Sequence, residues 1–334
     1  MATAQETHEY PGDLNDVPGW LWPLDQVLFS WFLERQKRQG TEGDLLELGA
    51  YMGKSAILLG HHLREGETLT VCDLFGTEPP DAANRAEAAQ SYSTLTRQAF
   101  ERNYLSFHDS LPTIVQDVSS TITDEVAPGT CRFAHIDASH LYEHVHGDIG
   151  AARDLLLPDG IVVLDDFRSE HTPGVAVAAW EAVLNRGLRP VCLSSQKLYG
   201  TWGDPEPLQE ELMAALRDRD DVAVTVEQAA GHRLVRARAK GKRMQPPSLP
   251  SSRHPAPAPT PTPSAPRAEA KPAQARPAQT RPPRPRTPRD RARRLALDVL
   301  PPVVTRAVRR YRAAQRAKAG STAQNTGGTG QSRP

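Results

Sequence analysis

The chain has 334 residues and no formal net charge at pH 7, but its charges and prolines are unevenly distributed. From residue 240 onward lie 18 of the 30 prolines, 21 lysines and arginines and three acidic residues, which leaves 19 basic and 37 acidic residues before that point. An acidic body with a basic tail is long enough for one large domain. Because no run approaches the roughly 18 to 20 apolar residues of a membrane span, a membrane-spanning class is excluded.

The N-terminal segment, residues 1–40, is predicted to form a helical lid. Its first residues are polar and acidic and lack the features of a secretory signal, so we expect a cytoplasmic protein. Residues 20–36 place apolar side chains at helical spacing. Trp20, Trp22 and Trp31 could cover a substrate mouth, but the packing of an amphipathic helix explains them better.

Apolar runs alternate with helical patterns over residues 41–239, which we interpret as one domain. Strands are expected at 44–48, 68–75, 111–117, 131–137, 160–166, 189–195 and 196–202, and helices at 54–63, 142–157, 175–186 and 208–219. Residues 221–228 and 232–239 read as a closing strand pair. This alternation predicts an α/β fold with a mostly parallel sheet and helices on both faces. Cys72, Cys131 and Cys192 fall in the apolar runs and are expected to be reduced core residues.

The tail lacks apolar periodicity over most of its length. Residues 240–288 are predicted to be a disordered Pro/Arg-rich linker, residues 289–318 a basic segment with some helical pattern, and residues 319–334 a disordered end. Such a tail could contact an anionic membrane or another polyanion weakly, or serve as a passive extension. No aromatic side chains are interleaved with the arginines, so specific nucleic-acid binding is not expected.

The turn after the first predicted strand has the features of a nucleotide-binding turn. Glycines there let a ligand approach the backbone, and the start of the next helix offers unpaired amide donors. Asp73 ends the second strand, where a carboxylate can accept the hydroxyl groups of a ribose. The dinucleotide pattern G-x-G-x-x-G fails, because Tyr51 and Lys54 occupy its second and third glycine positions. A tight turn without a ligand remains the alternative.

Three aspartates end two other predicted strands. Asp137 closes the strand at 131–137, and Asp165 and Asp166 close the strand at 160–166. If these strands are neighbours, the three carboxylates converge and repel one another unless they are protonated or hold a cation. Oxygen ligands of this kind suit Mg²⁺. A single aspartate of this type is better explained as a helix cap, but the three together favour a metal site.

The two motifs together resemble the class I S-adenosylmethionine (SAM)-dependent methyltransferases, in particular the cation-dependent O-methyltransferases of the macrocin and cephalosporin pathways. The resemblance covers roughly residues 40–203 and rests on the E-x-G-x-x-x-G turn and on the run FAHIDASHLYEHVHGDIGAARDLLLPDGIVVLDDF. It implies a Rossmann-like fold with seven strands. Ala138 and Asp159 stand where the family has glycines, and Ser139 where it sometimes has a further Asp.

What the resemblance implies about the site can be given residue by residue. SAM would bind at Glu47, Gly49, Tyr51, Gly53, Ser55, Asp73, Asp117, Ser119 and Asp137, and Mg²⁺ or Mn²⁺ at Asp137, Asp165 and Asp166. His140 would take a proton from a metal-bound hydroxyl group, although packing at the strand-to-helix turn explains it almost as well. Asp109 and Ser110 are an alternative to Asp117 and Ser119 near the adenine.

Three functions follow from these expectations. The first is methyl transfer from SAM to a hydroxyl group of a small molecule, such as a sugar or secondary metabolite, by a chain that could form a homo-oligomer. The second is a catalytically inactive methyltransferase-like tethering protein whose tail binds membrane or polyanion. The third, an NAD-dependent oxidoreductase, is disfavoured by the glycine pattern.

Overall fold

The computed structural model describes residues 10–85, 92, 94–241 and 244–253. The chain divides into two compact units, Met1–Pro261 and Thr262–Pro334, and every described residue belongs to the first. The predicted segments at 289–318 and 319–334, and the linker after residue 253, lie outside the described residues. Within the described part, no helix has both the length and the apolar character needed to cross a membrane.

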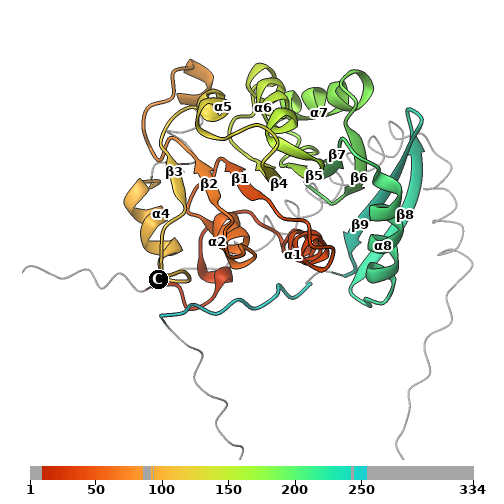
Figure 1. Ribbon diagram of the computed structural model, residues 1–334, viewed down its shortest axis with the longest axis horizontal. Coiled ribbons are helices and arrows are strands. Elements are labelled where there is room, and N and C mark those ends of the chain that lie inside the picture. The colour runs from red at the N-terminus through yellow and green to blue at the C-terminus, as the bar shows by residue number, and fades with distance from the viewer. Residues whose placement is uncertain (1–9, 86–91, 93, 242–243, 254–334) are drawn as a thin grey trace, which may run out of the picture. The chain divides into compact units, whose positions relative to one another are not determined.

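Nine strands of the described chain form one sheet in the order β3-β2-β1-β4-β5-β7-β6-β9-β8 (Figure 1). They are β1 Asp44–Leu48, β2 Leu69–Cys72, β3 Thr113–Val115, β4 Cys131–Ile136, β5 Leu156–Leu164, β6 Arg189–Leu193, β7 Leu198–Thr201, β8 Val222–Ala229 and β9 His232–Ala239. Strands β1 to β5 pair in parallel, and β7 runs antiparallel between β5 and β6. The β8–β9 hairpin joins β6 through a parallel pairing with β9, so the sheet exceeds the expected seven strands by two.

Helices cover both faces of the sheet, as the sequence predicts (Figure 1). One apolar cluster joins the sheet to α1, α2, α4 and α8, and a second joins it to α5, α6 and α7. The helices are α1 Pro23–Arg38, α2 Lys54–His61, α4 Arg97–Tyr104, α5 Ile122–Glu125, α6 Tyr142–Leu155, α7 Pro173–Asn185 and α8 Pro205–Arg217, with short 3-10 helices η1 Leu14–Asp16 and η2 Ser119–Thr121. All three cysteines are buried and free, as expected.

Helix α1 is a core helix. Its Phe29 is fully buried and packs edge-on against Phe133 of β4 and Tyr199 of β7, with ring centroids 5.2 and 6.1 Å away. Helix α1 therefore does not form the predicted lid, and of the described part of that segment only the short turn before α1 is a candidate for a lid.

The parallel register places the predicted motifs at one edge of the sheet. Leu48 of β1 pairs with Ile136 of β4, and Ile136 pairs with Leu164 of β5. The residues that follow continue this ladder, because the amide of Asp137 donates to Leu48 at 2.7 Å and the amide of Asp165 donates to Ile136 at 3.0 Å. The glycine turn and the aspartates therefore emerge side by side.

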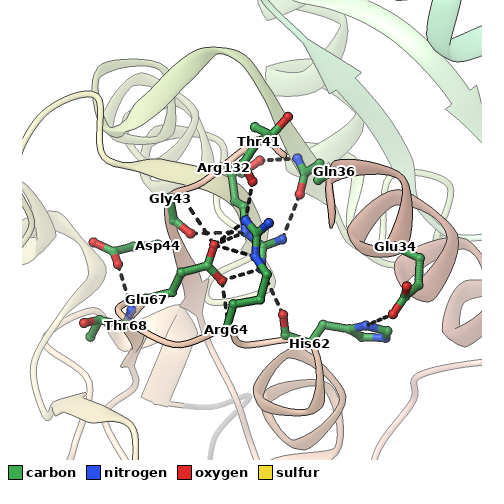
Figure 2. A network of polar contacts seen from close by, with 10 residues as sticks. All are labelled: Glu34, Gln36, Thr41, Gly43, Asp44, His62, Arg64, Glu67, Thr68 and Arg132. Carbon is green, nitrogen blue, oxygen red and sulfur yellow. Dashed lines mark hydrogen bonds and ion pairs between the residues drawn. The ribbon is translucent and has the colours of Figure 1, made fainter. Parts of the chain in front are cut away.

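A buried ion-pair network holds the opposite, amino-terminal edge of the sheet together (Figure 2). Arg132 of β4 is 1% exposed, and its guanidinium donates to both carboxylate oxygens of Glu67 at 2.9 and 2.7 Å. The same guanidinium donates to the side chain of Gln36 and to the carbonyl of His62, both at 2.9 Å. Arg64 pairs with the same carboxylate. These contacts connect α1, the end of α2 and the turn before β2 to β4.

Part of the predicted linker packs on the domain. Residues 244–253 run past η1, where Leu249 and Pro250 meet Asp13 and Leu14 through backbone hydrogen bonds and an isolated antiparallel bridge. Ser251 is 2% exposed, and its hydroxyl donates to the carbonyl of Ser106 at 2.7 Å. The folded body therefore includes residues 244–253, beyond the predicted boundary at residue 239. This segment lacks apolar periodicity and is held by backbone hydrogen bonds.

Candidate active site

A cavity of about 1830 Å³ opens at the edge of the sheet where the glycine turn and the aspartates emerge. It is lined by the turns after β1, β2, β4 and β5, by η2 and by one face of α6. Nine of the predicted site residues line it: Gly49, Tyr51, Asp73, Asp117, Ser119, Asp137, His140, Asp165 and Asp166. The alternative pair, Asp109 and Ser110, does not. Most of the predicted site is therefore assembled in one place.

The turn after β1 is shaped by uncommon backbone conformations. Gly49 has φ +81°, and a Cβ atom there would lie 2.1 Å from the carbonyl oxygen of Asp137. Gly53 is the left-handed N-cap of α2, with φ +91°. Tyr51 also has a positive φ of 48°, which is strained for a residue with a side chain. The turn thus lies against the end of β4 so closely that only glycine fits at position 49.

Asp73 fixes this turn. Its Oδ2 accepts hydrogen bonds from the amides of Ala50 at 2.7 Å and Tyr51 at 3.0 Å, and its Oδ1 accepts one from Phe75 at 2.7 Å. Burial raises the pKa of Asp73, and these amide hydrogen bonds oppose the rise. A carboxylate offers about four acceptor positions. Asp73 therefore holds the loop and keeps an acceptor position toward the cavity.

Three predicted cofactor residues do not line the cavity. Gly53 and Ser55 lie at the start of α2, where Gly53 sets the direction of the helix and Ser55 is buried. Glu47 is fully buried in β1, and its Oε1 lies 2.8 Å from Nδ1 of His135. Glu47 is the register partner of His135 in β4, so both side chains project from the same face of the sheet.

A buried polar chain runs behind the cavity from Glu47 to Asp165. His135 is 1% exposed, and its Nε2 lies 3.4 Å from Nζ of Lys197. Lys197 is 1% exposed and forms an ion pair with Oδ2 of Asp165. Burial lowers the pKa of Lys197, and the carboxylates around it, those of Asp137, Asp25 and Glu47, raise it. One positive charge therefore stands directly behind the predicted metal ligands.

The three aspartates differ in their surroundings. Asp165 is 9% exposed, and besides Lys197 it accepts the amide of Asp166 at 2.7 Å. Burial raises the pKa of Asp137, although the nearby Lys197 and His135 lower it. Burial would also raise the pKa of Asp166, but hydrogen bonds from His140 and Ser169 outweigh it and lower that pKa. Of Asp137 and Asp166, the second is thus the more readily ionised.

His140 lies against this cluster. Its Nε2 is 3.2 Å from Oδ2 of Asp166, and its ring lies at right angles to that of His171, with centroids 6.3 Å apart. Side-chain donor atoms of Asp137, His140 and Asp166 lie within 4.8 Å of one another, as do those of His135, Asp137 and Asp165. Asp137 belongs to both groups. The three predicted aspartates therefore do not form one such group; they are divided between two groups that share Asp137.

The structure fits the predicted divalent cation in donor chemistry and in charge. The donors are mostly carboxylate oxygens, which Mg²⁺ and Mn²⁺ prefer. Three carboxylates and the ammonium group of Lys197 leave two net negative charges when His140 is neutral. A divalent cation would balance these two negative charges. Among the described residues, no lysine or arginine other than Lys197 forms an ion pair with the three aspartates.

Aromatic side chains line the entrance of the cavity. Trp20 and Trp22, in the turn before α1, are 58% and 52% exposed and belong to the cavity wall. The ring of Trp20 lies 5.2 Å from that of Tyr51 and 6.3 Å from that of Tyr92. The prediction that the tryptophans pack in the core is therefore wrong for Trp20 and Trp22. Trp31 is partly buried and packs against the core. Both exposed side chains precede the helix, outside its amphipathic periodicity.

Sequence reasoning missed two parts of this site. Lys197 and Tyr199 are both buried, and the Tyr199 hydroxyl donates to Asp25 at 2.7 Å. The available signal for Lys197 was a charged residue at the start of an apolar strand, because a buried ammonium group requires a carboxylate partner. His144 lines the cavity and contacts Asp81 at 3.2 Å. That contact joins distant segments and has no local signal.

Comparisons with known proteins find one family model and a number of solved structures. Residues 46–167 match a family model described as a methyltransferase domain. Among solved structures, the O-methyltransferase NovP is 19% identical, covers 54% of this chain and 81% of its own, and has a TM-score of 0.42. The calicheamicin methyltransferase CalS11 is 18% identical (57% and 84% covered, TM-score 0.39), and an O-methyltransferase from Bacillus cereus in complex with SAH is 16% identical (65% and 80%, TM-score 0.30). No curated protein matches the sequence.

Proposed function

We propose that this chain, whose residues 46–167 match a family model described as a methyltransferase domain, transfers a methyl group from SAM to a hydroxyl group of a small molecule. One observation carries the proposal: the glycine turn and the Asp137–His140–Asp166 cluster lie in the wall of the same cavity. Gly49 is in direct backbone contact with Asp137, so a ligand held by the turn lies beside the carboxylates. A methyl donor and an acceptor bound there would be neighbours.

The cofactor would lie across the carboxyl ends of β1, β2 and β3. Its methionine part would bind along the turn at Gly49 and Tyr51, and the free acceptor position of Asp73 would take a ribose hydroxyl group. Asp117 and Ser119, which follow β3 and line the cavity, would border the base. This order follows from the order of the strands in the sheet, because ligands of such folds bind beyond the strand ends.

His140 would act as the general base. Its Nε2 lies 3.2 Å from Oδ2 of Asp166, and a neutral imidazole has one ring nitrogen that can accept a proton. Bound SAM would supply the methyl group to the acceptor oxygen, with the electron pair of the carbon–sulfur bond passing to sulfur, and His140 would take the hydroxyl proton. Holding the two reactants in one cavity would provide much of the rate enhancement.

Asp137, Asp165 and Asp166 would hold a divalent cation, Mg²⁺ or Mn²⁺. When bound, such a cation lowers the pKa of a hydroxyl group and fixes its approach. Lys197 fixes the position of Asp165 from behind, so this carboxylate is held in place before any ligand arrives. The charges of Asp137 and Asp166 then remain for the cavity side.

Calorimetry tests the proposal without knowledge of the acceptor. S-adenosylhomocysteine (SAH) and Mn²⁺ are each titrated into wild type, Asp166→Asn and the control Asp218→Asn, an exposed residue at the end of α8 that does not line the cavity. We expect SAH to bind all three proteins and Mn²⁺ to bind Asp166→Asn at least about tenfold more weakly than wild type. Absence of SAH binding to wild type would overturn the methyltransferase proposal. Equal Mn²⁺ binding to all three would overturn the metal site alone.

The alternative of an inactive tethering protein depends on a tail that lies outside the described residues, so no observation here favours it.

A further inference from the structure

Two tryptophans at the entrance of the cavity have no role in the proposed mechanism. Trp20 and Trp22 are 58% and 52% exposed, whereas Leu21 between them is 7% exposed and belongs to the core. Both indole side chains line the cavity. Exposure of large apolar rings to water is unfavourable, and apolar side chains gathered at the mouth of a cavity are typical of binding sites.

The backbone that carries these indoles is held in place by α1. Gln26 is 2% exposed, and its side-chain amide donates to the carbonyl of Leu21 at 3.1 Å and to the side chain of Asn15 at 3.0 Å. The backbone amide of Gln26 donates to the carbonyl of Trp22 at 3.0 Å. Because the turn is fixed before a ligand arrives, less ordering entropy is lost when the rings bind one.

The indoles adjoin the proposed site of methyl transfer. The ring of Tyr51 lies 5.2 Å from that of Trp20, and the backbone amide of Tyr51 donates to Asp73 in the turn after β1. Gly49 of the same turn lies against the carbonyl of Asp137. One short turn therefore connects the aromatic entrance with the carboxylate cluster, and a molecule on the rings would extend toward the methyl donor.

The cavity has room for a second molecule beside the cofactor. Its volume is about 1830 Å³, whereas the pocket of a single drug-sized ligand occupies roughly 300–1,000 Å³. The rings at the entrance offer flat apolar faces and few hydrogen-bonding groups. Such a surface suits an aromatic ring better than a sugar, whose several hydroxyl groups each need a polar partner.

The charges of the cavity wall disfavour an anionic acceptor. Among the described residues, Arg85 is the one lysine or arginine that lines the cavity. Its guanidinium pairs with Glu78 at 3.5 Å and donates to the carbonyls of Pro79 and Pro80 at 3.1 and 2.6 Å. A phosphate or carboxylate group on the acceptor would therefore meet acidic side chains and one cation that is already paired.

We propose that Trp20 and Trp22 form an acceptor subsite, which binds by stacking a flat aromatic ring system that carries no negative charge. The hydroxyl group to be methylated would then point toward the Asp137–His140–Asp166 cluster. This inference rests on the proposed function, because it requires a methyl donor bound at the turn after β1. The acceptor is thus a phenol-type compound, and Trp20 and Trp22 are specificity-determining residues for it.

Calorimetry on protein saturated with SAH and Mg²⁺ tests the subsite, because the cofactor site is then filled. The probes are esculetin, which is a flat aromatic diol, its carboxylate derivative on the same ring system, and methyl β-D-glucopyranoside, which has hydroxyl groups but no aromatic ring. A slightly acidic buffer keeps the hydroxyl groups of esculetin protonated. Wild type should bind esculetin at least about tenfold more tightly than either other probe.

The variants identify the residues responsible. Trp20→Ala and Trp22→Ala should each weaken esculetin binding about tenfold, since stacking on one aromatic side chain contributes on that order. Trp20→Phe keeps a ring and should restore part of the loss. The control is Leu184→Ala, which removes a side chain of α7 that is 57% exposed and lies outside the cavity wall, and it should bind esculetin as wild type does.

The possible failures are distinguishable. Absence of SAH binding to wild type would show that the proposed function is wrong. If SAH binds but esculetin does not, or binds no more tightly than the other probes, the acceptor subsite alone is wrong, whether or not the variants fold. The subsite is also wrong if the folded alanine variants keep wild-type affinity for esculetin, or if they lose SAH and esculetin equally, because the rings would then serve the cofactor.

Discussion

Replacement of Glu67 by glutamine tests the network in Figure 2. The side chain of Glu67 is 5% exposed and pairs with Arg132, which is almost completely buried. Burial alone would raise the pKa of Glu67, but hydrogen bonds from Arg132 and Arg64 outweigh it and lower the pKa to about 2, from an ordinary value of 4.5. Glu67→Gln keeps the shape of the side chain and removes its charge.

The magnitude follows from that pKa difference, which corresponds to about 3 kcal/mol of stability. The cost of breaking a buried ion pair, about 3–5 kcal/mol, gives the same order independently. Because the folded pKa is depressed, this stabilisation is complete above about pH 4.5 and is lost as the pH falls toward about 2. Glu67→Gln should therefore unfold about 3 kcal/mol more easily than wild type at pH 7, and the difference should shrink in acid.

Urea denaturation at several pH values measures this difference. The control is Glu101→Gln, which breaks a more exposed pair with Arg97 on α4 and should cost no more than about 0.5 kcal/mol. A loss below about 1 kcal/mol for Glu67→Gln at pH 7, or a loss that stays constant down to pH 2, would refute the reasoning, since the expected loss comes from the pairing of the Glu67 charge with Arg132 and Arg64.

Two further predictions concern the site. Gly49→Ala should abolish SAH binding by calorimetry, because its Cβ would collide with the Asp137 carbonyl at 2.1 Å and its φ is +81°; retained affinity would show that the turn can move. Lys197→Met should lower the free energy of unfolding by about 3–5 kcal/mol, because it leaves Asp165 buried without its cation; a loss as small as that of the conservative Lys197→Arg would contradict this.

The sequence predicted the alternation of strands and helices because apolar periodicity is a local property. The strands ending at Leu48, Ile136 and Leu164 lie where expected, and parallel pairing then brings the glycine turn and the aspartates together without further information. The match of residues 46–167 to a methyltransferase domain confirms the resemblance that these motifs carried.

Contacts between distant segments could not be predicted in this way. The partners of Arg132 are 65 and 96 residues away in the sequence, and Lys197 is 32 residues from Asp165. No periodicity encodes such pairs, because they depend on how helices and strands pack. Glu47 illustrates the limit: its motif position predicts a cofactor residue, but its contact with His135, 88 residues away, has no signal in the sequence.

The strand-like segment 244–253 has a consequence for any shortened form of the chain. Asp13 accepts the hydroxyl of Ser248 and the amide of Leu249, and Trp20 stands only a few residues after Asp13. Truncation after residue 240 would remove the hydrogen bonds that Asp13 accepts from Ser248 and Leu249. The indole rings that border the cavity entrance would then be held less firmly. A form that ends after Arg253 would keep Leu249 bound to Asp13 and Leu14. It is therefore the shorter protein that is suited to measurements at the cavity entrance.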